Sequence, residues 1–108
     1  MPVSEITSEE EFKNVLKDNL AIIDFYAQWC GPCKLMAPKF VELSNNSKYS
    51  KVKFYKCDVD EVEEASDACG VQSLPTFFAL EKGEKFDDLK GANYDNLIKL
   101  LDDLVAED

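Results

Sequence analysis

The sequence predicts a single α/β domain over residues 1–108, with strands and helices in the order βαβαβαββα. The first observation is an almost unbroken apolar run at residues 20–27, which is typical of a strand buried on both faces in mid-sheet. The second is that segments with apolar residues at helical spacing alternate with short strand-like segments on either side of this run. No repeat, linker or low-complexity tract interrupts the alternation. Helices on both faces of a mostly parallel sheet are therefore expected.

The chain before this run predicts one short strand and one helix. The strand is expected at residues 3–6. Ser8 and Glu11 have the spacing of a capping box, which indicates a helix start, and the helix is expected to end near residues 18–19. Its expected buried stripe is Phe12, Val15 and Leu16.

A longer helix is expected after the run, from Cys33 to about Lys48. Pro38 lies inside it and should bend it, because proline removes one helical hydrogen bond. The expected apolar stripe is Met36, Phe40 and Leu43. A third strand is predicted at residues 52–58.

The second half of the chain predicts a short helix, a hairpin and a final helix. Asp60 is the expected N-cap of the short helix, and Gly70 is expected to close it. Its expected buried residues are Val62, Ala65 and Cys69. Strands are predicted at residues 76–80 and 85–90, joined at Gly83; the second carries Asp87 and Asp88 and so belongs at a sheet edge. Asn93 is the predicted cap of a last helix with the stripe Leu97, Ile98, Leu101, Leu104 and Val105.

Two cysteines, Cys30 and Cys33, stand at the junction of the buried strand and the long helix. A thiol of pKa about 8.5 needs roughly 2 kcal/mol to become half ionised at neutral pH. A helix N-terminus supplies about 0.3–1 kcal/mol, and up to ~2 in partly buried geometry. The rest is expected from a hydrogen bond donated by Cys33 or by a backbone N–H. Pro32 suits the first turn of the helix. Cys30 is thus the predicted nucleophile.

Composition disfavours several other classes of protein. A net charge of −10 without arginine or histidine argues against nucleic acid or an anionic membrane as partner. No apolar run approaches the roughly 20 residues that span a bilayer. A secreted disulfide framework is a weaker reading of the four cysteines, because the apolar pattern already provides a core. A zinc site is weaker still, since Cys57 and Cys69 are far apart and no histidine is present.

Trp-Cys-Gly-Pro-Cys-Lys at residues 29–34, after Ile-Asp-Phe-Tyr-Ala at residues 23–27, closely resembles the thioredoxin family. The resemblance extends over essentially the whole chain. Further matching positions are Asp24, Pro38, residues 73–76, Gly83 and Gly91. Gln28, before the tryptophan, is a minor departure that puts nothing catalytic in doubt. The resemblance implies a thioredoxin fold: a five-stranded mixed sheet in the order 1-3-2-4-5, flanked by four helices, with the fourth strand antiparallel to its neighbours.

The resemblance also implies a general protein dithiol–disulfide oxidoreductase. Cys30 would attack a disulfide in a client protein, and Cys33 would resolve the mixed disulfide, so that the pair cycles between dithiol and disulfide. Thioredoxin reductase would restore the dithiol with NADPH, and the chain itself would hold no cofactor and no metal. One rival is a disulfide-forming oxidant of the isomerase kind, which the Gly-Pro between the cysteines disfavours. The other rival is a docking module that needs no turnover.

Asp24 is the polar exception in the apolar strand. Burial should raise its pKa, so that it can take a proton from Cys33 and return it, and thioredoxin-like proteins carry their buried acid at this position. The alternative is a structural carboxylate paired with Lys56 on the neighbouring strand. Both can hold, because Lys56 would lower the pKa of Asp24 again.

The resemblance further implies a docking surface around the cysteines. The Leu74–Pro75 bond is expected to be cis and to leave the backbone of Ser73 and Leu74 free to pair with a client strand; a trans proline opening an edge strand is the alternative. The expected walls and rim of this surface are Trp29, Gly31, Pro32, Gly91 and Ala92.

Expectations for the remaining features are simpler. Cys57 should be an inert buried residue, and Cys69 is a possible regulatory site of oxidation. The partners are disulfide-containing clients and thioredoxin reductase, and a monomer is expected. The first five residues lack a secretory or transit leader, so we expect the cytosol or the nucleus.

Overall fold

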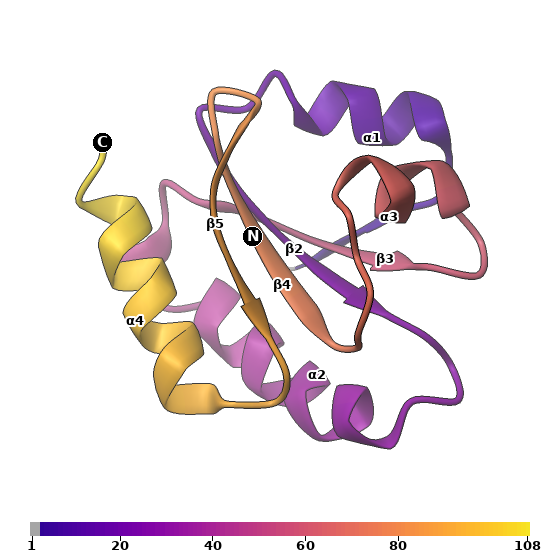
Figure 1. Cartoon of the computed structure of the whole chain (residues 1–108). Coiled ribbons are helices and arrows are strands. Elements are labelled where there is room, and N and C mark those ends of the chain that lie inside the picture. Colours follow the sequence, from indigo (N-terminus) through magenta and orange to yellow (C-terminus); the bar gives the residue numbers. More distant parts are fainter. Residues whose placement is uncertain (1–2) are drawn as a thin grey trace.

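The computed structural model describes residues 3–108, so Met1 and Pro2, where the leader expectation begins, lie outside the described residues. Strands and helices alternate from one end of the chain to the other (Figure 1). They are β1 (Ser4–Ile6), α1 (Glu9–Val15), β2 (Leu20–Tyr26), α2 (Gly31–Ser44), a 3-10 turn (Ser47–Tyr49), β3 (Lys53–Asp58), α3 (Glu63–Ala68), β4 (Thr76–Glu81), β5 (Glu84–Lys90) and α4 (Tyr94–Val105).

The sheet has the strand order β1-β3-β2-β4-β5, as the family resemblance implied. β3 pairs in parallel with β1 and β2, whereas β4 is antiparallel to β2 and β5. Of the five strands, β1, β2, β3 and β5 therefore run in the same direction and β4 runs the opposite way, as expected of a mostly parallel, mixed sheet. The hairpin at Gly83, where Lys82 and Gly83 have φ values of 52° and 82°, reverses the chain between β4 and β5 in two residues.

The central strand β2 is buried on both faces, as its apolar sequence predicts. Leu20 and Ile22 pack with residues of α2 and α4, and Ile23 and Phe25 pack with residues of α1 and α3. Figure 1 shows the same layers, with α1 and α3 on one side of the sheet and α2 and α4 on the other. The two hydrophobic clusters thus hold the middle strand, and the loop that follows it, in a fixed place.

Helix α1 is shorter than expected and is capped differently at its start. The Ser8 hydroxyl accepts the N–H of Glu11 (3.1 Å), as in a capping box. The Glu11 carboxylate, however, accepts the N–H of Thr7 (2.6 Å) rather than that of Ser8. The helix ends at Val15, before residues 18–19.

Helix α2 begins at Gly31 rather than Cys33 and ends at Ser44 rather than near Lys48. The earlier start follows from Cys30 and Pro32, because Cys30 acts as the N-cap and proline fits the first turn. Pro38 lies inside the helix as expected.

The prediction of Asp60 as the N-cap of α3 is wrong. The N-cap is Val62, which makes no side-chain cap bond. The carboxylate of Asp60 instead accepts the indole N–H of Trp29 (3.0 Å), so it is committed elsewhere. Gly70 follows the helix with φ +65°, as expected of a closing glycine.

Helix α4 closes the fold against the sheet. The Asn93 side chain accepts the N–H of Asn96 (3.0 Å), which confirms the predicted cap. The buried residues of α4 are Leu97, Leu100, Leu101 and Leu104. Leu100 was missing from the predicted stripe, whereas Ile98 and Val105 are only half-buried. β5 lies at the edge of the sheet, as its charges predict. Within residues 3–108, none of the helices has the length and apolar character needed to cross a membrane.

Candidate redox site

Cys30 and Cys33 form a disulfide across the first turn of α2, with Cα atoms 5.3 Å apart. β2 and the short loop after it deliver Cys30 to the N-cap position, where its sulfur accepts the backbone N–H of Cys33 (3.2 Å). The predicted backbone donor to Cys30 is therefore present in the oxidised state. When the disulfide opens, this donor and the helix N-terminus favour negative charge on the Cys30 sulfur.

A groove of about 620 Å³ lies beside Cys30. Trp29, with 71% of its surface exposed, forms one wall and is anchored by its hydrogen bond to Asp60. The predicted docking residues Gly31, Pro32, Ser73 and Leu74 also line the groove. Further lining residues, which the sequence did not single out, are Val59, Glu63, Ser66, Asp67, Val71 and Gln72. Cys30 is itself one of the lining residues of the groove.

Other predicted docking residues lie apart from the groove lining. The Leu74–Pro75 bond is cis, as expected, and Pro75 itself is buried. Gly91 and Ala92 do not line the groove. Gly91 is instead tied to Pro75 by a backbone hydrogen bond, its N–H donating to the Pro75 carbonyl (2.8 Å).

Asp24 is buried in β2, with 4% of its surface exposed. Its Oδ1 atom has no hydrogen-bond partner among the described residues. Burial raises the pKa of Asp24 from 3.8 to about 7, although Lys56 lowers the pKa and Glu5 raises it. A cavity of about 130 Å³ is lined by Asp24, Cys33 and Lys56 together. The structure thus places the buried acid and the second cysteine in the lining of one small cavity.

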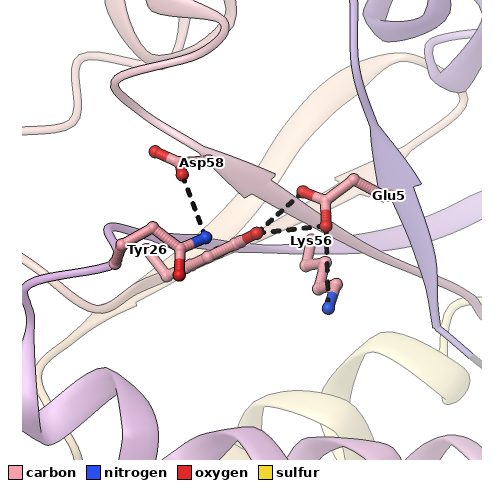
Figure 2. A network of polar contacts seen from close by, with 5 residues as sticks. Glu5, Tyr26, Lys56 and Asp58 are labelled. Atoms are coloured by element: carbon pink, nitrogen blue, oxygen red, sulfur yellow. Dashed lines mark hydrogen bonds and ion pairs between the residues drawn. The ribbon is translucent and has the colours of Figure 1, made fainter.

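The ion pair of Lys56 is made with Glu5 and not with Asp24. The Lys56 ammonium lies 3.6 Å from Glu5 Oε1 (Figure 2). Asp24 and Lys56 are register partners on β2 and β3, as the sequence suggested, yet no ion pair joins them. Lys56 therefore acts on Asp24 as a nearby charge and leaves its carboxyl without a bonded partner.

Glu5 and Tyr26 are neighbours of the acid that the sequence analysis did not find. The Tyr26 hydroxyl donates to both carboxylate oxygens of Glu5 (2.9 and 3.0 Å). Burial and the Glu5 carboxylate raise the pKa of Tyr26, so the hydroxyl stays protonated and remains a donor. A signal was available, because Tyr26 lies two residues after Asp24 in a strand and so on the same face.

The other two cysteines are free thiols. Burial raises the pKa of both Cys57 and Cys69 to about 12, so neither is a thiolate at neutral pH. Cys57 is fully buried, as expected of an inert residue, whereas a regulatory role for Cys69 stays a prediction. Among residues 3–108 no cluster of three or more potential ligands could hold a metal ion.

Comparison with known proteins agrees with this geometry. The family model "Thioredoxin" matches residues 3–103. Thioredoxin-1 of Schizosaccharomyces pombe is 44% identical over 92 residues, covering 84% of this chain and 87% of the relative. Human thioredoxin is 40% identical over 106 residues, covering 95% of this chain and 99% of the relative. A solved structure of Plasmodium falciparum thioredoxin superposes with a TM-score of 0.88 at 41% identity, covering 94% of this chain and 98% of that one.

Proposed function

Because the chain belongs to the thioredoxin family, we propose that it reduces disulfides in client proteins and is itself re-reduced by a thioredoxin reductase. The chain is a dithiol–disulfide oxidoreductase whose redox centre is the Cys30–Cys33 pair. The observation that carries the proposal is the position of this pair: the disulfide closes the first turn of α2, and Cys30 lines the groove beside it.

The first step is attack of the Cys30 thiolate on one sulfur of a client disulfide. A bond forms between Cys30 and that sulfur while the client sulfur–sulfur bond breaks. The second client sulfur leaves as a thiolate and takes a proton from water. The backbone N–H of Cys33 supports the Cys30 thiolate before attack, because it donates to the same sulfur.

The second step is attack of Cys33 on the Cys30 sulfur. We assign Asp24 as the acceptor of the Cys33 proton, since both line one cavity and burial raises the pKa of Asp24 to about 7. The bond between Cys30 and the client breaks, and the client leaves with its second sulfur reduced. Two electrons have then passed to the client, and Cys30–Cys33 is left as the disulfide.

Clients are proposed to dock as an extended segment in the groove. The backbone of Ser73 and Leu74 would pair with it, since both residues line the groove and neither is part of a strand. Trp29, Gly31 and Pro32 would contact its side chains. Gly91 and Ala92 are proposed as the outer rim, and Pro75 as the residue that holds the Ser73–Leu74 backbone in place.

Reduction of insulin disulfides, driven by NADPH and a thioredoxin reductase, tests the function. The parent should turn over, and Cys30→Ser should abolish turnover. Cys33→Ser should retain the first attack and accumulate covalent complexes with clients, which mass spectrometry detects. Cys57→Ser is the matched control and should behave like the parent. If Cys30→Ser accumulates the complexes instead, the two roles are reversed. A binding assay with the double variant Cys30→Ser/Cys33→Ser separates this function from that of a docking module. A docking module would keep its function through partner binding alone, without either cysteine.

The cytosol or the nucleus is the proposed compartment, with the monomer as the working form. Cys57 and Cys69 remain free thiols, which suits a reducing compartment. Microscopy of the tagged full chain tests the compartment, and a mitochondrial signal would contradict it. Light scattering tests the monomeric state, for which the expected molar mass is that of one chain, about 12.2 kDa.

A further inference from the structure

Three charged side chains stand in a row across three neighbouring strands. Lys56 on β3 is the register partner of Glu5 on β1 and of Asp24 on β2. Register partners in a sheet project on the same face, so Lys56 has one carboxyl group on each side. It can approach either of them, and the structure has it on the Glu5 side, with Nζ 3.6 Å from Oε1.

The Glu5 carboxylate is itself held in place from β2. Tyr26 reaches across and donates its hydroxyl hydrogen to this carboxylate, with distances of 2.9 and 3.0 Å to the two oxygens. The Lys56 ammonium lies 5.8 Å from the centre of the Tyr26 ring. In Figure 2, dashed lines join the Glu5 carboxylate both to the Tyr26 hydroxyl and to the Lys56 ammonium. Lys56 is thus drawn toward a fixed anion and the aromatic face beside it.

We propose that Glu5 is a positioning residue of the redox site: it keeps the Lys56 ammonium from forming an ion pair with Asp24, so that Asp24 remains a carboxyl group able to take and return a proton. The proposal rests on the proposed role of Asp24 in the second step of the reaction. Stability is not the reason for the Glu5–Lys56 contact, because both side chains are partly exposed (35% and 47%) and such pairs stabilise a fold little.

The other groups around Asp24 are not arranged, as Glu5 is, to hold Lys56 away from its carboxyl group. Lys34 of α2 lines the same cavity, and Asp58 at the end of β3 accepts a hydrogen bond from Gln28 (3.4 Å). β4 places the uncharged Phe77 in register with Asp24. Among these groups, Lys56 is the cation in direct register with the acid, and Glu5 is the group that binds it. Removing the Glu5 charge should therefore lower the pKa of Asp24 in two ways: a nearby negative charge is lost, and Lys56 is released toward Asp24.

The test measures the pKa of the Asp24 carboxyl group. The NMR signal of its carboxyl carbon is followed against pH in the oxidised protein. Four proteins are compared: the parent, Glu5→Gln, Lys56→Gln and the double variant. Glu5 and Asp24 are two strand spacings apart, about 10 Å. Loss of the Glu5 charge by its direct effect alone should lower the pKa of Asp24 by about 0.3 to 0.6 at effective dielectric constants of about 40 to 80. In the parent, Glu5→Gln should lower the pKa of Asp24 by more than this direct effect. In the Lys56→Gln background, Glu5→Gln should lower the pKa of Asp24 by no more than the direct effect. Glu84→Gln on β5 is the charge-matched control and should leave the pKa unchanged.

The double-variant comparison separates a positioning effect from a simple charge effect. Equal effects of Glu5→Gln with and without Lys56 would overturn the proposal, and so would no effect in either background. Tyr26→Phe should lower the pKa of Asp24 in the same direction, because Glu5 is then less firmly held; an unchanged value would count against the proposal. This titration measures Asp24 directly and does not depend on turnover. The proton-transfer role fails separately, if Asp24→Asn resolves mixed disulfides as fast as the parent.

Discussion

Replacing Asp24 by asparagine should make the protein more stable at pH 8 and remove a large part of its pH dependence. Burial raises the pKa of Asp24 from 3.8 to about 7, so between these pH values the folded state binds more protons than the unfolded state. Stability must then fall as pH rises through this window. With these two pKa values, the loss between pH 5 and pH 8 is about 2.5 kcal/mol. The asparagine side chain does not titrate, so the Asp24→Asn variant should not show this loss of stability.

Urea melts of the oxidised parent and of Asp24→Asn at pH 5 and pH 8 measure this difference. Comparing the two pH values within each protein cancels the constant cost of burying the asparagine amide. A pH below 5 is avoided because the isoelectric point is about 4.4, where association is favoured. With a urea m-value of about 1–3 kcal/mol/M, the midpoint of the parent should move by about 0.8–2.5 M more than that of the variant.

Two results would refute this reasoning. If parent and variant lose the same stability between pH 5 and pH 8, the pKa of Asp24 is not raised in the folded state. If the variant is the less stable protein at pH 8, the Asp24 carboxylate is a structural ion-pair partner of Lys56. The structure argues against the second result, because Lys56 is paired with Glu5 and Oδ1 of Asp24 has no hydrogen-bond partner within residues 3–108.

Three further predictions concern the fold. Gly83→Ala should destabilise the protein more than Gly70→Ala in urea melts. Both glycines have positive φ, which costs alanine about 1–2 kcal/mol. Of the two, Gly83 is the one where an added Cβ would meet a backbone atom, the carbonyl oxygen of Leu16, at 2.5 Å. Equal losses would show that the hairpin shifts freely. Asn93→Ala should lower the free energy of unfolding by about 1 kcal/mol, because α4 loses its cap. Leu101→Ala should lower it by about 2–5 kcal/mol, since this fully buried side chain leaves a cavity; a smaller loss would mean that the core closes around it.

The sequence was most informative where one local cause decides the structure. The apolar run of β2, the Asn93 cap and the glycines after α3 and in the hairpin were all placed correctly, because burial, capping and positive φ each leave a direct mark on residue type. The strand order was a different matter. It came from the family resemblance, since the alternation of strands and helices does not determine which strands become neighbours.

The errors arose where two groups compete for one partner. Asp60 is a good N-cap by type, yet the indole of Trp29 takes its carboxylate, and α3 begins later without a side-chain cap. The alternative of an ion pair between Lys56 and Asp24 met the same competition, because Glu5 binds the Lys56 ammonium. Such choices depend on distances between segments far apart in the chain, which no local pattern records. The same limit hid Glu5, which lies on a strand far away in the chain, whereas Tyr26 could have been found from its place two residues after Asp24.

The two edge strands of the sheet, β1 and β5, affect how readily the protein aggregates. An edge strand presents unpaired backbone groups that can recruit the edge of another molecule and start aggregation. β1 is only three residues long, and β5 carries charged side chains and pairs with β4 through a register shift at Ala79 and Leu80. A short edge and a charged, irregular one are both poor templates for a foreign strand. Both edges of the sheet are thereby guarded against pairing with copies of this chain.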